Sequence, residues 1–331
     1  MNTPTRILFA VKNPESRRRG ALDKTIRIAK RLGARLELFN AISSPVYLDL
    51  QPLSGHTLQQ LRRESLDLRT RQLEKLAARA RKAGVTADVA VQWDFPPHEA
   101  IVRRARAIEA DLVIAECHEG RRLAPWLLHL TDWELLRDCP TPVLILKNPR
   151  AWRRGRVLAA VDPSHAHDKP AQLDAAILAH AAAWSAKMRG SLDVMHANYP
   201  SLAGFALGDP SIDAATVTAS FESQVAGDKR GFEAFAEKHK IPKRRRHLFT
   251  GDPVAAIPAA ARSLRADLVV MGAVARSGLK RVLIGNTAER VLNELPCDVL
   301  VVKPAHAEHA VAREPRGMRV VAPSPIMPMP A

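Results

Sequence analysis

The chain contains the stretch Ala-Asp-Leu-Val twice, at Ala110–Val113 and at Ala266–Val269. From these points onward the segments Ala110–Lys147 and Ala266–Lys303 align without a gap, at a constant offset of 156 residues. Both segments close with a proline, a Val-Leu pair and a lysine. The repeat is far longer than the roughly 20–50 residues of a solenoid unit, so it indicates one domain that has been duplicated.

Each half alternates apolar strands with helices in the same order, which is typical of a doubly wound α/β domain with a five-stranded parallel sheet. The expected strands are Arg6–Val11, Leu36–Ala41, Val85–Trp93, Asp111–Glu116 and Val143–Leu146, then Val157–Val161, Leu192–Ala197, Arg245–Thr250, Asp267–Gly272 and Val299–Val302. The expected helices are Ala21–Leu32, Leu58–Lys82, His98–Glu109 and Asp132–Asp138, then Leu173–Arg189, Asp213–His239, Val254–Leu264 and Thr287–Glu294.

Length and composition fit two globular domains of ordinary type, with 331 residues of which 47% are hydrophobic and 25% charged. We place the domains at residues 1–149 and 150–304, and we expect the proline-rich residues 305–331 to form a flexible tail. No apolar run approaches the roughly 18 residues that span a bilayer, so we expect no membrane insertion. The cysteines form no disulfide pattern and the chain does not begin like a signal peptide, which favours a cytoplasmic protein.

The formal net charge is +16, and much of it comes from short runs of arginine such as Arg17–Arg19 and the basic run Lys243–Arg246. Clustered arginine neutralises phosphates and releases counterions, so a basic protein associated with polyanions or nucleic acid stays open as an alternative function. The runs are scattered over both halves, and the few Trp and Tyr residues give no stacking platform. We therefore expect non-specific attraction to polyanions and no sequence-specific binding of nucleic acid.

Open α/β sheets bind ligands outside the carboxyl ends of their strands. In the second half, Asp162 follows the first strand, and a glycine-containing loop after the fourth strand leads to a helix N-terminus, which suits an anion such as phosphate. The alternative is a tight connection in which Thr287 only caps the helix. We assign the ligand site to Asp162, Met271, Gly272, Ala275, Arg276, Gly278, Gly285, Asn286 and Thr287.

Both halves resemble domains of the universal stress protein family, and the whole chain resembles the tandem members of its E type. The stretches that carry the resemblance are Trp93, Pro97–Ile101, Thr131–Pro140, Gly285–Val291 and Cys297–Pro304. The resemblance implies a stress-resistance protein that binds a small molecule or signals and does not catalyse a reaction. It also implies that Val143–Lys147 and Val299–Lys303 pair as an intrachain pseudo-dimer, while a homodimer of whole chains stays open as well.

Members of that family that bind ATP carry three glycines and a Ser or Thr in the loop after the fourth strand, and an Asp after the first. The second half matches at Asp162, Gly272 and Gly285 and departs at Ala275 and Asn286. Because Ala275 puts a Cβ where the backbone would approach phosphates, ATP is a candidate for a compromised site and no cofactor is assigned. A non-nucleotide, apolar ligand beside the alanine-rich helices is the alternative.

The first half has lost this motif, because Lys12 or Asn13 stands at the acidic position and Glu116, Glu119 and His129 stand at the glycine positions. Carboxylates facing a triphosphate repel it, so we expect this domain to be structural or to support the other.

Metal and catalytic sites find no support in the sequence. The histidines at 165 and 167, and the group Cys117, His118 and His129, lack the convergent spacing of a zinc site. No nucleophile–base–acid set stands out either, so we expect neither a metal nor an enzyme. A slow ATPase ranks below a binding protein.

Overall fold

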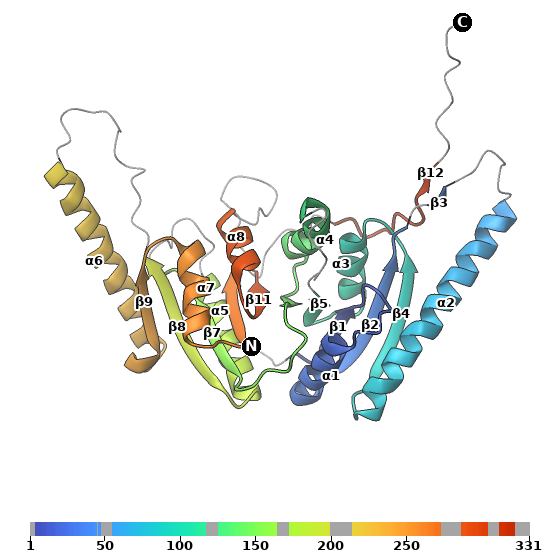
Figure 1. The fold of residues 1–331 in the computed structure, drawn as a ribbon, viewed down its shortest axis with the longest axis horizontal. Helices are drawn as coiled ribbons and strands as arrows, with labels where there is room; N and C mark the ends of the chain where they lie inside the picture. Colours follow the sequence, from blue (N-terminus) through green and yellow to red (C-terminus); the bar gives the residue numbers. More distant parts are fainter. Residues whose placement is uncertain are drawn as a thin grey trace, which may run out of the picture. The chain divides into compact units, whose positions relative to one another are not determined.

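The structure is a computed structural model that describes residues 4–44, 46–47, 55–116, 125–163, 172–198, 214–272, 286–303 and 311–321 (Figure 1). The chain divides into two compact units. We call Pro4–Thr141 together with the C-terminal residues from His309 the first unit, and Pro142–Glu308 the second unit.

The first unit contains a parallel sheet whose described strands lie in the order β4 (Ala87–Trp93), β2 (Arg35–Ile42), β1 (Arg6–Ala10) and β5 (Leu112–Glu116). Its helices are α1 (Gly20–Leu32), α2 (Gly55–Lys82), α3 (Pro97–Ala107) and α4 (Pro125–Asp138). Residues such as Leu8 and Ile114 in the strand centres are fully buried. Continuous burial of this kind explains why β1 and β5 are apolar over most of their lengths and do not alternate.

The second unit repeats this strand order. Its parallel strands are β9 (Arg246–Thr250), β8 (Ser191–Asn198), β7 (Arg156–Ala160), β10 (Leu268–Gly272) and β11 (Asp298–Val302). Its helices are α5 (Leu173–Lys187), α6 (Ala214–Lys238), the 3-10 turn η2 (Lys243–Arg245), α7 (Pro253–Ser263) and α8 (Asn286–Glu294). The two sheets confirm the doubly wound fold and the duplication that the repeat predicted.

The last strand of the first repeat joins the sheet of the second unit. β6 (Val143–Leu146) pairs antiparallel with β11, with Leu144 opposite Leu300 and both fully buried. The predicted pairing of the two fifth strands within one chain is therefore present. β6 covers the row of backbone groups that an uncovered edge strand would expose. As a result the compact units divide between Thr141 and Pro142, whereas the repeat divides near residue 149.

A buried carboxylate fixes the chain that follows β6. Asp298 is fully buried and accepts hydrogen bonds from the backbone N–H of Lys147 (3.0 Å) and of Asn148 (3.1 Å). The indole Nε1 of Trp152 donates to the same carboxylate at 2.7 Å. Since a buried carboxylate is costly unless its oxygens are paired, these contacts keep residues 147–152 on the second unit.

Part of the C-terminal tail is ordered, and the expectation of a flexible tail is wrong for residues 311–321. β12 (Val320–Val321) pairs parallel with β3 (Val46–Tyr47) in the first unit. Arg316 donates from Nε to the carboxylate of Glu99 at 3.0 Å, and its backbone N–H donates to Asp94 at 2.9 Å. Two buried carboxylates hold this segment, and composition alone does not reveal them.

Helix ends are built alike in both units. After α1, α2, α3, α5, α6 and α7, two successive N–H groups donate back to carbonyls of the last turn, as in a Schellman motif. The first of the two residues is left-handed, with φ of 69° at Gly33, 84° at Gly84 and 48° at Glu109 in the first unit. At the same repeat positions the second unit has Arg189 (52°), Lys240 (55°) and Arg265 (50°).

The left-handed conformation of Lys240 leads to a prediction about the stability of the protein. A side chain with a Cβ costs about 1 kcal/mol there relative to glycine. We expect Lys240→Gly to raise the free energy of unfolding by about 0.5–1 kcal/mol in urea denaturation. Lys229→Gly, inside α6, serves as the control and lowers it by about 1 kcal/mol. A loss of stability in both variants would show that Lys240 is held by contacts that outweigh its backbone cost.

Candidate functional site

Strand ends assemble the predicted ligand site of the second unit. Because β10, β7 and β8 are parallel neighbours, the residues after β7 and at the end of β10 meet at one edge of the sheet. This edge brings Asp162 and Gly272 together, while Met271 is buried in the sheet. α8 begins at Asn286 and Thr287, whose side chains are not described. Ala275, Arg276, Gly278 and Gly285 lie outside the described residues.

Asp174 and His196 restrict the chain around Asp162. Its backbone N–H donates to Asp174 Oδ1 at 3.0 Å. His196 Nδ1 lies 3.1 Å from the carbonyl oxygen of Val161 and 3.6 Å from Asp162 Oδ1. Because a carbonyl only accepts, Nδ1 carries the hydrogen and donates it. The side chain of Asp162 stays 47% exposed.

Gly272 has a structural reason to be glycine. A Cβ at this position would lie 2.8 Å from Cδ2 of Leu173 and 3.2 Å from Cδ1 of Ile177, both on α5. The helix therefore packs directly on the glycine. This contact explains Gly272 without any approach of a phosphate, which is the use that the sequence suggested.

The first unit has a pocket of about 140 Å³ at the corresponding strand ends. Its lining combines polar and apolar residues from the ends of β1, β2 and β5 and from the helices α3 and α4, among them Lys12, Phe39, Asn40, Ile101, Glu116, Asp132 and Leu135. Lys12 follows β1 by two residues, as Asp162 follows β7, and Glu116 stands at the repeat position of Gly272. The carboxylate of Glu116 disfavours a nucleotide phosphate at this position.

In both units, a polar side chain of the second strand contacts a backbone carbonyl just after the first strand. Asn40 is buried and its Nδ2 donates to the carbonyl oxygen of Val11 at 2.7 Å. His196, at the same repeat position, contacts the carbonyl of Val161 in the same way. Both contacts fix the chain directly after the first strand of the unit, next to Lys12 in the first unit and Asp162 in the second.

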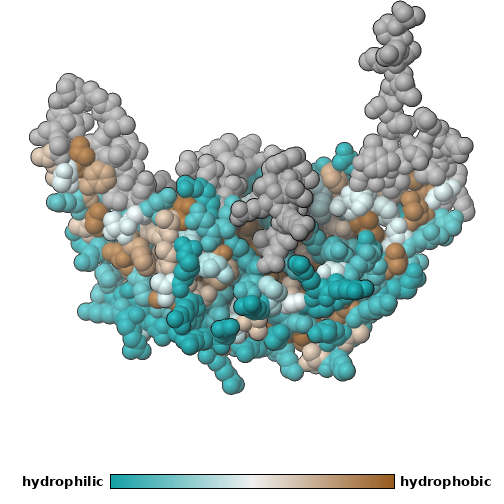
Figure 2. Space-filling model, in the orientation of Figure 1, coloured by the Kyte–Doolittle hydropathy of each residue, from teal (hydrophilic) through white to brown (hydrophobic). Residues whose placement is uncertain are grey.

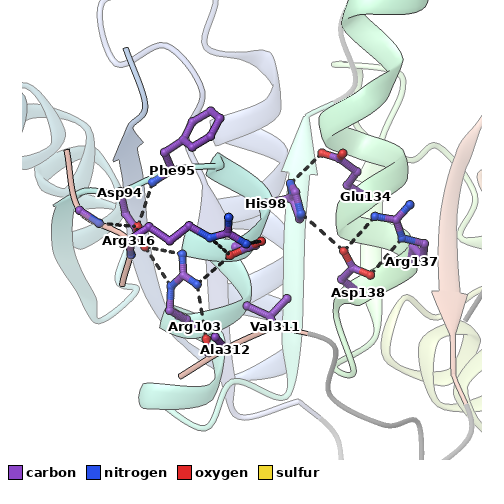
Figure 3. A network of polar contacts seen from close by, with 12 residues as sticks. Asp94, Phe95, His98, Arg103, Glu134, Arg137, Asp138, Val311, Ala312 and Arg316 are labelled. Atoms are coloured by element: carbon purple, nitrogen blue, oxygen red, sulfur yellow. Dashed lines mark hydrogen bonds and ion pairs between the residues drawn. The ribbon is translucent and has the colours of Figure 1, made fainter. Parts of the chain in front are cut away.

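An ion-pair network ties the helices that wall the pocket of the first unit (Figure 3). His98 on α3 is buried, with Nδ1 2.8 Å from Glu134 Oε2 and Nε2 3.5 Å from Asp138 Oδ2 on α4. Arg137 donates to the same Asp138 carboxylate at 3.0 Å. These contacts join α3 and α4, which supply Ile101 and other residues to the pocket wall.

A second cluster fixes the start of α3 (Figure 3). Asp94 is fully buried and receives Nη2 and Nε of Arg103 at 2.6 and 2.9 Å. Glu99 accepts from Arg103 at 3.0 Å and from Arg316 of the tail. Buried carboxylates are thus matched by guanidinium groups, and removal of one partner would leave an uncompensated charge.

The pKa of Asp138 yields a prediction with a definite sign. Burial alone would raise this pKa, but hydrogen bonds from His98 and Arg137 lower it to about 2. The charged form therefore stabilises the fold by on the order of 2 kcal/mol above about pH 4, and this contribution is lost as pH falls through about 2.

We expect Asp138→Asn to lower the free energy of unfolding by about 2 kcal/mol at neutral pH and by less at about pH 3, measured by urea denaturation. Asp88→Asn, at an exposed pair with Arg35, is the control and changes it by less than about 1 kcal/mol. An equal effect of Asp138→Asn at both pH values would contradict the assignment.

Within the described ranges, no helix combines the length and the apolar character needed to cross a membrane. Among the same residues, no three His, Cys, Asp or Glu side chains gather as metal ligands.

Comparisons with known proteins agree with the repeat and the fold. The sequence profile of the universal stress protein family matches residues 4–147 and 154–303. Universal stress protein E of Salmonella typhi is 28% identical over 298 residues, which cover 90% of this chain and 94% of that protein. Universal stress protein E of Escherichia coli (strain K12) is also 28% identical, with 90% of this chain and 93% of that protein covered.

A solved structure is also similar over nearly the whole chain. The functionally unknown protein PA1789 from Pseudomonas aeruginosa PAO1 superposes with a TM-score of 0.65 at 27% identity, and covers 92% of this chain and 95% of that chain. Both repeats thus match one family over nearly their full lengths. The chain belongs to the universal stress protein family, as a tandem, two-domain member of the E type.

Proposed function

We propose that the second domain of this stress-response protein binds a small molecule at the carboxyl edge of its sheet and passes the signal on. The observation that carries the proposal is the half-exposed carboxylate of Asp162 at the end of the first strand of that domain. Asp174 accepts a hydrogen bond from its backbone N–H, and His196 Nδ1 lies 3.6 Å from Asp162 Oδ1, so the position of the carboxylate is restricted before a ligand arrives. A positioned group loses less freedom on binding than a mobile one.

ATP is the first candidate for this ligand. A carboxylate at Asp162 can accept hydrogen bonds from the hydroxyl groups of a ribose. α8 begins at Asn286, and the first N–H groups of a helix are free to bind an anion. Asn286 ends the loop that contains Ala275, Gly278 and Gly285, and this loop starts after β10, the neighbour of the strand β7 that Asp162 follows.

The test is native mass spectrometry of the full chain with ATP. We expect an ATP adduct in which Asp162→Asn lowers occupancy at least roughly tenfold, about the contribution of one or two hydrogen bonds to a charged group. The matched control is Lys12→Ala at the corresponding position after β1 of the first domain, which leaves occupancy unchanged. Loss of the adduct in the control alone would move the site to the first domain, and a growing ADP mass would reveal a slow ATPase.

A less phosphate-dependent, apolar ligand is the second candidate. The contact of Gly272 with Leu173 and Ile177 supports it, because this glycine is explained by packing and need not admit a phosphate. The alanine at position 275 points the same way, since it is less suited than glycine to close approach. A gently purified chain that gives no ATP adduct but retains another small mass would favour this candidate.

We further propose that the first domain supports the second and does not hold the nucleotide. Its pocket places Glu116 and Asp132 near the strand ends together with Lys12. Repulsion between these carboxylates and a triphosphate disfavours ATP there.

A further inference from the structure

Three helix ends of the second unit place a cation where the backbone favours glycine. Arg189, Lys240 and Arg265 are left-handed, with φ of 52°, 55° and 50°. The first unit has Gly33, Gly84 and Glu109 at the same repeat positions, with no cation among them. A side chain with a Cβ is disfavoured in this conformation. Each of the three cations therefore raises the free energy of the folded backbone relative to a glycine at the same position.

The topology puts these three cations on one edge of the sheet. Arg189 precedes β8, Lys240 precedes η2 and β9, and Arg265 precedes β10. The strands β10, β7, β8 and β9 are neighbours and run parallel, so all of them begin at the same edge. With neighbouring strands about 4.8 Å apart, the row extends over about 14 Å. Figure 2 shows hydrophilic surface at the lower left, over the turns at this edge of the second unit.

The acidic side chains on this edge interact with groups other than these three cations. Lys243 and Arg244 are exposed in the turn before β9. Asp193 is occupied by Arg245 at 3.0 Å and by His247 at 2.9 Å. The carboxylate of Asp267 likewise accepts backbone N–H groups of residues 153, 154 and 156. Within the part of the chain that the structure describes, Arg189, Lys240, Lys243, Arg244 and Arg265 form no ion pair.

Helix dipoles alone do not account for this row. Basic residues at a helix C-terminus are favourable, and Lys187, Lys238 and Arg262 already fill that role in the last turns of α5, α6 and α7. The first unit meets the same need with Lys30 and Arg31 in the last turn of α1 and keeps Gly33 beyond them. The cations at the left-handed positions of the second unit are additional to this stabilisation.

We propose that the amino-terminal edge of the second unit's sheet binds the phosphate backbone of a nucleic-acid duplex without reading its sequence. One strand of a duplex presents a phosphate every 3.4 Å along the axis, so a row of about 14 Å faces about four phosphates. Among the described residues, the exposed large hydrophobic side chains are Leu61 and Leu68 on α2 of the first unit. The edge therefore presents no platform for stacking single-stranded bases and no anchor for a membrane.

The test measures fluorescence anisotropy of labelled duplexes of DNA and of RNA with mixed sequence, over a series of salt concentrations. The informative variant combines Arg189→Gly, Lys240→Gly and Arg265→Gly, because glycine suits the left-handed backbone and the fold is retained. Each lost phosphate contact reduces the slope of log K against log salt by about 0.9. We expect the slope of the full chain to fall by about 2.7 in this variant, with the affinity at low salt lowered at least roughly tenfold.

The control variant combines Arg71→Gln, Lys75→Gln and Lys82→Gln, which removes three exposed cations from α2 of the first unit. It changes net charge by the same amount and should leave the slope unchanged. Equal losses in both variants would reduce the effect to net charge and overturn the proposal. So would the absence of duplex binding at low salt, or binding to anionic vesicles without binding to duplexes. None of these outcomes depends on the ligand of the carboxyl edge.

Discussion

The common direction of the strands within each repeat decides where the residues beside the strand ends lie. Every helix returns the chain to the amino edge, and every strand delivers it to the carboxyl edge. Asp162 and Lys12 are therefore at the carboxyl edges of their units, while Arg189 and Gly33 are at the amino edges. Five residues of strand separate the two edges by about 16 Å. One edge can therefore change its chemistry without disturbing the other.

Because the domain is duplicated, corresponding positions of the two units can be compared directly. At the carboxyl edge, Asn40 and His196 contact the same backbone carbonyl, so this contact is kept while the residue after the carbonyl differs. That residue is Lys12 in the first unit and Asp162 in the second. At the amino edge, the same Schellman turns are kept while glycine or glutamate gives way to arginine or lysine. Conserved geometry with changed charge at both edges indicates two domains that have specialised in different ways.

The sequence predicted what depends on local pattern and on the repeat, and missed what depends on distant partners. The alternation of strands and helices followed from apolar runs and the offset, and the pairing of β6 with β11 followed from the resemblance to the family. α4 begins at Pro125, ahead of the expected Asp132, because a proline suits a first helical turn. The ordered tail escaped prediction because the partner of Arg316 is Glu99, 217 residues away. The packing role of Gly272 depends on α5 and carries no sequence signal.

Hydrogen–deuterium exchange on the full chain tests most directly whether the two edges of the second unit have separate roles. The chain would be measured alone, with ATP, with a DNA duplex and with both. We predict that the duplex slows exchange in residues 187–191, 238–246 and 262–268, while ATP slows it in residues 160–163 and 271–287. Both ligands together should protect both sets. Protection of the carboxyl edge by the duplex, or of one shared set by both ligands, would contradict the separation of the two edges.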